Sequence, residues 1–313
     1  GLVVMLVMSL FVGCGGEEAP APDEGGADEG YTIGYSCNNF NDTFQTYIVD
    51  AAEAYAEANE EIALEVQDAQ EDVVKQQDQV STMIENGVDA LVVVPVDTSA
   101  MEPITAAAKE AGIPLCYVNR NPFGEGELPE GVYYVGSQEI VAGRLQGEYL
   151  VDQMGEEGGV AILMGILSNE GALKRTEGNE EILSQYEGIE ILAKETGNWQ
   201  RDQGMSLTEN WLTAYGDELN AILANNDEMA LGAAQALQAA GRTDIIVMGV
   251  DAIPDAKVAV GEGTIAGTVL QDAVGQGEGA LTVVHKVLMG EDVDPVTWID
   301  FVLINPDNLA DFQ

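Results

Sequence analysis

The feature that most constrains the fold of this chain is a regular alternation of strand-like and helix-like segments after Gly30. Short apolar runs alternate with amphipathic stretches, a pattern that predicts parallel sheets with right-handed crossovers. Strands are expected at about 31–37, 62–67, 89–95, 114–119, 132–136, 159–164, 189–194, 219–224, 244–250, 264–270 and 297–304. So many strands fit two sheets of five or six better than one barrel. We therefore expect an α/β protein with two doubly wound, Rossmann-like lobes.

Several of these strands end on a polar side chain that could bind a hydroxyl group. In open α/β sheets the ligand crevice lies beyond the carboxyl ends of the strands. Such endings occur in both halves of the chain, at Asn38, Asp42, Asn119, Arg120, Asn226, Asp251 and Gln271. They predict one small polar ligand held between two sheets.

The residue types at these endings match the chemistry of a sugar. Carboxylates accept hydrogen bonds from hydroxyls, arginine donates, amides do both, and aromatic rings cover the C–H faces. The endings supply Asp42, Asp251, Arg120, Arg175, Asn119, Asn226 and Gln271, with Phe44 and Trp199 as rings. Singly, each has a simpler interpretation: Asp42, Asn226 and Asp251 as helix caps, the rings as core, and Arg175 as a surface residue. Their shared topological position favours a site.

The charge of the chain excludes some partners. Its 55 acidic and 11 basic residues give a formal net charge of −44, which repels nucleic acid and anionic membranes. This acidity fits adaptation to high salt or an acidic extracellular protein, and the composition leaves both open. The single histidine, His285, argues against a histidine-based catalytic triad or a multi-histidine metal site.

The first 30 residues do not resemble a folded domain. Leu2 to Val12 is apolar but shorter than the ~20 residues that span a bilayer, so it indicates part of a secretion signal. The following Gly13-Cys14 resembles a lipoprotein cleavage box, which implies lipidation of Cys14; a plain signal peptide is the alternative. Residues 15–30 are predicted to form a flexible acidic linker. Cys37 and Cys116 are expected to be buried free thiols.

Read across its strand endings, the chain resembles the periplasmic sugar-binding proteins of ABC importers, which have the type I periplasmic-binding-protein fold. The resemblance is greatest to galactose/glucose-binding proteins and smaller to ribose-binding proteins. The motifs that carry it are Lys75-Gln76-Gln77-Asp78-Gln79, Tyr133-Tyr134-Val135-Gly136, Ala224-Asn225-Asn226-Asp227-Glu228-Met229-Ala230-Leu231-Gly232-Ala233, Gly249-Val250-Asp251-Ala252-Ile253-Pro254, Ala266-Gly267-Thr268-Val269-Leu270 and Asp307-Asn308-Leu309-Ala310-Asp311-Phe312.

The resemblance implies a set of ligand-binding residues. Trp199 is expected to stack opposite Phe44, and Arg175 to donate from the second lobe. The implied set is Asn38, Asp42, Phe44, Asn119, Arg120, Asn169, Arg175, Trp199, Asn226, Asp251 and Gln271. No catalytic residue, cofactor or metal is implied, since the stretch between Gln153 and Val160 is too short for the calcium loop of the galactose binders.

Three positions depart from the family pattern. Asn169 replaces a His, Gly171 replaces an Asp, and Val94 replaces an Asn that the ribose binders use. Sites that pair a given hydroxyl discriminate strongly against ligands that lack it. We therefore expect these three positions to decide which sugar is bound.

The resemblance also implies domain boundaries. The first lobe is expected over 31–137 plus 272–300 and the second over 138–271 plus 301–313, after a partial lipoprotein signal segment at 1–14. The chain would cross between the lobes near Ser137, Gln271 and Asp300. These crossings form a three-segment hinge, about which the lobes close when ligand binds the closed state more tightly.

The expected function is that of an extracytoplasmic solute-binding lipoprotein, monomeric and not an enzyme. It would be tethered to the membrane through Cys14, bind a galactose- or glucose-like hexose or a related pentose, and deliver it to the permease of an ABC importer. The alternatives are a cyclic polyol such as inositol as ligand, or presentation of a sugar to a chemoreceptor. A repressor effector domain would need a basic helix-turn-helix before Tyr31, where the chain is apolar and acidic. An oxidoreductase or kinase would need a Gly-rich nucleotide motif, which is missing.

Overall fold

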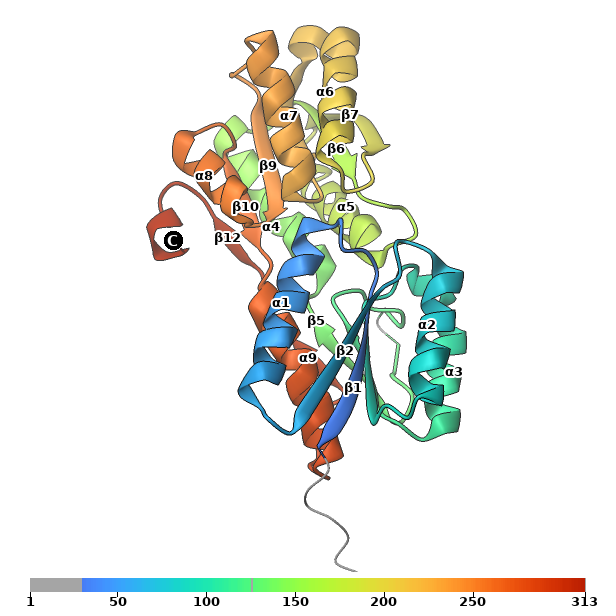
Figure 1. The fold of residues 1–313 in the computed structure, drawn as a ribbon. Coiled ribbons are helices and arrows are strands. Elements are labelled where there is room, and N and C mark those ends of the chain that lie inside the picture. The colour runs from blue at the N-terminus through green and yellow to red at the C-terminus, as the bar shows by residue number, and fades with distance from the viewer. Residues whose placement is uncertain (1–29, 125, 313) are drawn as a thin grey trace, which may run out of the picture.

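The computed structural model describes residues 30–124 and 126–312, which form two α/β lobes, one above the other (Figure 1). The strands are β1 (Tyr31–Cys37), β2 (Ile62–Asp68), β3 (Ala90–Val93), β4 (Leu115–Val118), β5 (Val132–Gly136), β6 (Glu157–Met164), β7 (Gly188–Thr196), β8 (Leu219–Ala224), β9 (Ile246–Asp251), β10 (Gly267–Leu270), β11 (Val296–Trp298) and β12 (Val302–Ile304). They form two six-stranded sheets, ordered β11-β5-β4-β3-β1-β2 and β12-β10-β9-β8-β6-β7. The predicted two-lobe α/β fold is confirmed.

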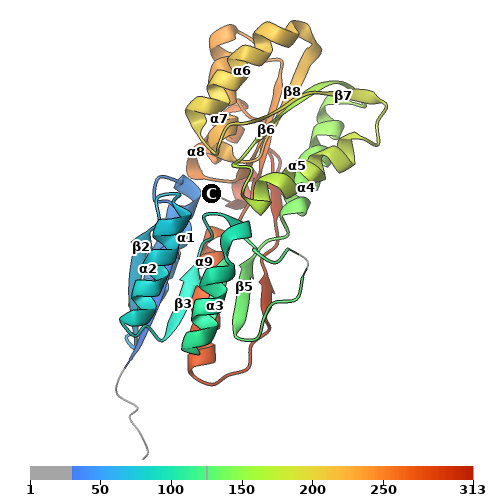
Figure 2. The ribbon, with the colours of Figure 1, turned by 90° about the vertical axis from the view of Figure 1, so that its right-hand side faces the viewer.

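Helices cover both faces of each sheet, as Figure 2 shows from the side. They are α1 (Thr43–Ala58), α2 (Val73–Glu85), α3 (Glu102–Ala111), α4 (Glu139–Met154), α5 (Glu170–Leu183), α6 (Arg201–Tyr215), α7 (Asp227–Ala240), α8 (Pro254–Glu262) and α9 (Ala273–Leu288), with short 3₁₀ turns at Thr98–Ala100, Gly216–Glu218 and Leu309–Phe312. Helices α1 and α9 pack together on one face of the first sheet, and α2 and α3 on the other. Helices α4 and α5 cover one face of the second sheet, and α6, α7 and α8 the opposite face.

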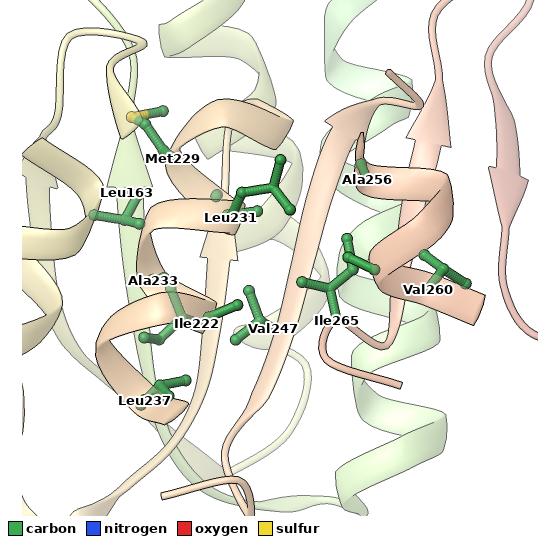
Figure 3. Packing of buried hydrophobic residues seen from close by; sticks show 14 of the residues in the cluster. Leu163, Ile222, Met229, Leu231, Ala233, Leu237, Val247, Ala256, Val260 and Ile265 are labelled. Atoms are coloured by element: carbon green, nitrogen blue, oxygen red, sulfur yellow. The ribbon is translucent and has the colours of Figure 1, made fainter. Parts of the chain in front are cut away.

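The core of the second lobe illustrates why the sequence pattern works. Met229, Ala233 and Leu237 recur every four residues along α7, so they share one helical face. That face packs over Ile222 of β8 and Val247 of β9, and all five side chains are buried (Figure 3). Since both sides of a parallel sheet are covered by helices, its strands are apolar throughout and end abruptly at polar residues.

Two glycines bring the backbones of α4 and α5 into direct contact. A Cβ atom at Gly143 would overlap the backbone oxygen of Arg175, and one at Gly178 would overlap that of Ile140. Only glycine allows so close an approach. The first turn of α4 is thereby fixed beside the middle of α5.

The chain passes between the sheets at residues 137–138, 271–272 and 299–301, next to the positions expected from the resemblance. The prediction of one strand over 297–304 is wrong. Those residues form two strands in different sheets: β11 pairs parallel to β5, and β12 pairs antiparallel to β10. The third passage interrupts the apolar run between them.

The two lobes touch each other through side chains. Thr43 Oγ1 in α1 donates to Glu228 Oε1 in α7 at 3.1 Å, and Thr98 Oγ1 donates to the backbone oxygen of Ser168 at 3.3 Å. The lobes therefore lie in a closed arrangement. Within the described ranges, no helix has the length and apolar character needed to cross a membrane. Cys14 and the linker up to residue 29 lie outside the described residues.

Candidate functional site

A cavity lies between the lobes, beyond the carboxyl ends of strands from both sheets. Its lining residues come from both lobes: Asp42, Phe44, Gln45, Asn119, Arg120, Glu139, Asn169, Gly171, Arg175, Trp199, Asn226, Asp251 and Gln271.

Asp42 has two roles in the first lobe. Its Oδ1 caps α1 by accepting hydrogen bonds from the backbone nitrogens of Phe44 (3.1 Å) and Gln45 (3.4 Å). Its Oδ2 lies 3.7 Å from the guanidinium of Arg120, at the cavity. Helix capping and a place in the site are therefore not exclusive, although the sequence presented them as alternatives.

The amide of Asn119 is held between two glutamines. Gln45 Nε2 donates to Asn119 Oδ1 at 2.8 Å, and Asn119 Nδ2 donates to Gln276 Oε1 at 3.0 Å. Next to it, Arg120 donates to the backbone oxygen of Pro95 at 2.9 Å. These bonds fix both side chains before any ligand arrives, which reduces the entropy that binding costs.

In the second lobe, Arg175 is the centre of a buried polar cluster. Its Nε donates to Glu139 Oε2 at 2.6 Å, one terminal nitrogen donates to the backbone oxygen of Asn225 at 2.6 Å, and the other donates to Gln271 Oε1 at 2.9 Å. Asp251 Oδ1 lies 3.6 Å from the same guanidinium. Charged hydrogen bonds of this kind hold a buried arginine in one orientation.

The two predicted aromatic rings both line the cavity. Trp199 Nε1 donates to Asn169 Oδ1 at 2.9 Å, so the indole is fixed by a neighbour that also lines the site. The guanidinium of Arg175 lies 5.8 Å from the centroid of the Trp199 ring, in cation–π range. Phe44 enters from the first turn of α1.

Three of the seven non-glycine residues with positive φ in the described part of the chain line this cavity. Asn119 (φ 67°), Trp199 (φ 66°) and Asp251 (φ 118°) all have positive φ, although none is glycine. Such conformations cost roughly 1–3 kcal/mol each and cluster at functional sites. The side chains of all three residues line the cavity.

Burial raises the pKa values of two cavity carboxyls. It holds the pKa of Asp251 well above the ordinary range for an aspartate, and the nearby Arg175 only partly opposes this. The pKa of Asp42 is also raised by burial, against the opposing effect of Arg120. A ligand that donates hydrogen bonds to these carboxyls favours their ionised forms.

The cavity is equipped for hydrogen bonding and stacking. Its side chains offer carboxylate acceptors, guanidinium donors and amides that do both, with two rings for apolar faces. The lone His285 bonds Tyr55 Oη at 3.2 Å within the first lobe and does not line the cavity. In the part of the chain that the structure describes, no three His, Cys, Asp or Glu side chains are grouped to hold a metal ion. Cys37 and Cys116 are buried free thiols, as predicted.

Comparison with known families decides the classification. A model described as the periplasmic binding protein domain matches residues 33–292. The chain belongs to the periplasmic binding protein family. This is a family of binding proteins rather than enzymes, and the resemblance inferred from the strand endings is confirmed.

Several relatives of this periplasmic binding protein are similar over most of their length. It is 44% identical over 286 residues (90% of this chain, 92% of the relative) to a "Putative rhizopine-binding protein" of Rhizobium meliloti. It is 38% identical to the xylitol-binding protein of Mycolicibacterium smegmatis, covering 81% of this chain and 72% of the relative. Among solved structures, a solute-binding protein of an ABC transporter from Bacillus halodurans, with bound myo-inositol, superposes with a TM-score of 0.86. That structure is 39% identical and covers 92% of this chain and 99% of its own.

The structure brings all but one of the predicted site residues to the cavity. Asn38 is the exception, because its side chain is fully buried and donates to Glu71 Oε1 at 2.7 Å. Glu71 in turn lies 3.8 Å from Arg120, so Asn38 is one layer outside the site. Val94, expected to influence ligand choice, is packed in the core of the first lobe and does not line the cavity. Asn169 and Gly171 do line it.

Two lining residues escaped the sequence reasoning. Gln45 lies one position beyond Phe44 in the first turn of α1, and Glu139 lies in the first turn of α4. Glu139 follows the end of β5 by three residues, so the strand-end rule could have found it. The signal was obscured because the acidic residues of this chain are so numerous.

Proposed function

We propose that this periplasmic binding protein captures a cyclic polyol, or a monosaccharide ring of similar size, between its lobes and delivers it to the permease of an ABC importer. The observation that carries the proposal is the cavity itself. It is lined from both lobes by hydrogen-bonding side chains and by the two rings Phe44 and Trp199.

The charges of the lining argue for an uncharged ligand. Three carboxyl groups, Asp42, Glu139 and Asp251, face the two guanidinium groups of Arg120 and Arg175. Each guanidinium already has a carboxyl group within 4 Å. An anionic ligand would have to displace these partners, at a large desolvation cost. A polyol donates to the carboxylates and accepts from the guanidinium groups without any net charge.

The relatives favour a sugar alcohol within this class. One similar structure holds myo-inositol, and one relative is named for xylitol. Both compounds lack an anomeric carbon and carry a hydroxyl on every carbon. A cavity lined from both lobes by many hydrogen-bonding groups suits such a ligand. The galactose- or glucose-like hexose expected from the sequence remains a competing member of the same class.

Transport follows from the proposed closure. A ligand that touches both lobes stabilises the closed form in proportion to its differential affinity, and a permease can then recognise that form. The protein would act as a monomer outside the cytoplasm, attached to the membrane by a lipid on Cys14. Replacement of Cys14 by Ser should release the protein from membranes in cell fractionation; retention of the variant at the membrane would remove the anchor from the proposal.

Calorimetric titration tests the ligand class. The panel is myo-inositol, xylitol, glucose, galactose, xylose and ribose, with glucuronate as an anionic control. We expect one-to-one binding that is tightest for a cyclic polyol, and no heat with glucuronate. Tighter binding of galactose or glucose would establish the hexose instead. Absence of binding to every polyol and sugar would refute the proposed function.

A further inference from the structure

Glu139 is a buried carboxylate whose hydrogen bonds are incomplete. Its side chain lines the cavity and only 3% of the residue is exposed. Oε2 accepts from Arg175 Nε at 2.6 Å, whereas Oε1 has one contact, from Gln271 Nε2, at the long distance of 3.5 Å. A carboxylate oxygen can accept two hydrogen bonds, so Oε1 has capacity left for a donor.

Gly171 leaves space next to this carboxylate. A Cβ atom at position 171 would lie 3.5 Å from both Cδ and Oε2 of Glu139, in ordinary contact. A side chain larger than that of alanine at position 171 would start from a Cβ atom that already contacts the carboxylate, and would occupy the space beside it. Both residues line the same cavity, and glycine adds no side chain of its own beside the carboxylate.

Neutralisation of Arg175 does not by itself account for Glu139. The guanidinium has other acceptors, since the backbone oxygen of Asn225 and the amide oxygen of Gln271 both accept from it, and the Asp251 carboxyl lies 3.6 Å away. Burial of a further carboxylate is costly unless hydrogen bonds satisfy its oxygens. A donor from the ligand would supply the bond that Oε1 lacks.

We propose that Glu139 and Gly171 together are the specificity-determining pair of this cavity. Glu139 accepts a hydrogen bond from one ring hydroxyl of the polyol, and Gly171 leaves the space which that part of the ring occupies. The inference rests on the proposed function, because it requires a polyol ligand. It implies that a ring lacking this one hydroxyl binds poorly.

The test uses Glu139→Gln, Gly171→Asp and the double variant, titrated calorimetrically with myo-inositol and its monodeoxy analogues. A hydrogen bond to a charged group contributes ~1.5–3 kcal/mol, so Glu139→Gln should weaken myo-inositol binding by roughly ten- to hundredfold. The wild type should reject one deoxy analogue most strongly, and Glu139→Gln should reduce that particular rejection, because a neutral amide oxygen accepts a weaker hydrogen bond than a carboxylate. If Glu139 only holds Arg175 in place, Glu139→Gln should weaken the binding of all analogues by the same factor.

Gly171→Asp keeps Glu139 but places a second carboxyl against it. We expect this variant to bind myo-inositol more weakly than wild type, and the double variant to recover part of the loss because glutamine removes the repulsion. Circular dichroism and thermal unfolding check that each variant folds.

The outcomes separate the two proposals. If the wild type binds no polyol or sugar, the proposed function fails. If the wild type binds but Glu139→Gln keeps both the affinity and the ranking of deoxy analogues, the inference about Glu139 is overturned. It is also overturned if Glu139→Gln weakens the binding of every analogue by the same factor, or if Gly171→Asp binds myo-inositol as tightly as the wild type does.

Discussion

Asn169 donates a hydrogen bond from Nδ2 to the backbone oxygen of Val96 at 3.0 Å and so joins the second lobe to the first at the cavity. The Oδ1 atom of the same amide accepts from Trp199 Nε1. The side chain of Asn169 therefore both contacts the other lobe and orients the indole ring of Trp199. An aspartate at this position would lose the donor, and an alanine would lose both bonds.

Asn169→Ala should accordingly weaken ligand binding about tenfold, since one neutral hydrogen bond contributes about 0.5–1.5 kcal/mol and the indole loses its anchor. Small-angle scattering without ligand should show a larger radius of gyration than wild type. Thr98→Val is the matched control, because it removes another hydrogen bond between the lobes at a residue that does not line the cavity. Equal effects of the two variants would mean that Asn169 acts through lobe contact alone.

Trp199→Ala should weaken polyol binding by roughly ten- to hundredfold, because burial of a large apolar side chain contributes ~1.5–3 kcal/mol. Trp199→Phe keeps a ring but loses the indole N–H, so its loss should be smaller. Calorimetry gives both affinities, and thermal unfolding shows whether the fold is kept. Wild-type affinity in the alanine variant would remove Trp199 from the site.

The contact between α4 and α5 should control both stability and affinity. Gly143→Ala forces a methyl group into the backbone of α5 at Arg175, and overpacking of this kind costs typically ~1–3 kcal/mol. The helices must separate, which moves Glu139 away from Arg175. We expect a lower melting temperature together with weaker ligand binding.

Gly171→Ala is the control for that substitution, since its Cβ enters only ordinary contact with Glu139. Its melting temperature should stay close to that of wild type. If Gly143→Ala were as stable as Gly171→Ala, the close approach of the two helices would not be a constraint.

The ligand-free protein should lose stability as pH rises through neutrality. Burial, reinforced by the negative charge of Glu139, raises the pKa of Glu170 to about 8. The folded state then holds a proton that the unfolded chain has released, so this contribution to stability is present below the unfolded pKa and is lost as pH rises to about 8.

Glu170→Gln removes this titration without changing the shape of the side chain. The melting temperature of the variant minus that of wild type should therefore increase between pH 5 and pH 8. Thermal unfolding at several pH values measures the difference, and the comparison cancels the general effect of net charge. A difference independent of pH would contradict a raised pKa at Glu170.

Added salt should stabilise the protein. A formal net charge of −44 produces self-repulsion in the folded state, and screening reduces it. We expect the melting temperature to rise between low and molar sodium chloride. A flat response would favour the general explanation of an acidic extracellular protein over adaptation to high salt.

Much of the fold and of the cavity was predictable because strand ends carry a strong signal. Asn119 directly follows β4, Asp251 ends β9, and Asp42 lies in the loop between β1 and α1. Parallel strands end at the same edge of a sheet. The polar residues at the strand ends could therefore be predicted to lie around one cavity. The aromatic residues followed from the same logic together with the family resemblance.

The errors at Val94 and Asn38 have a common cause, which is that sequence order does not reveal the face to which a side chain points. Val94 follows β3 at the expected edge, but strand alternation directs it into the core. Asn38 follows β1 and points away from the cavity toward Glu71. Strands of three residues, such as β11 and β12, are too short for any periodicity to separate them.

The three passages between the lobes have a mechanical consequence. Two rigid lobes joined by several connecting segments that lie side by side can rotate about one hinge axis, but they resist sliding and twisting. Gln271 lies in one of these passages and its side chain accepts from Arg175 inside the cavity. The hinge and the binding cavity thus share Gln271. Substitutions of this residue that change ligand specificity would therefore also change how far, and how readily, the lobes rotate.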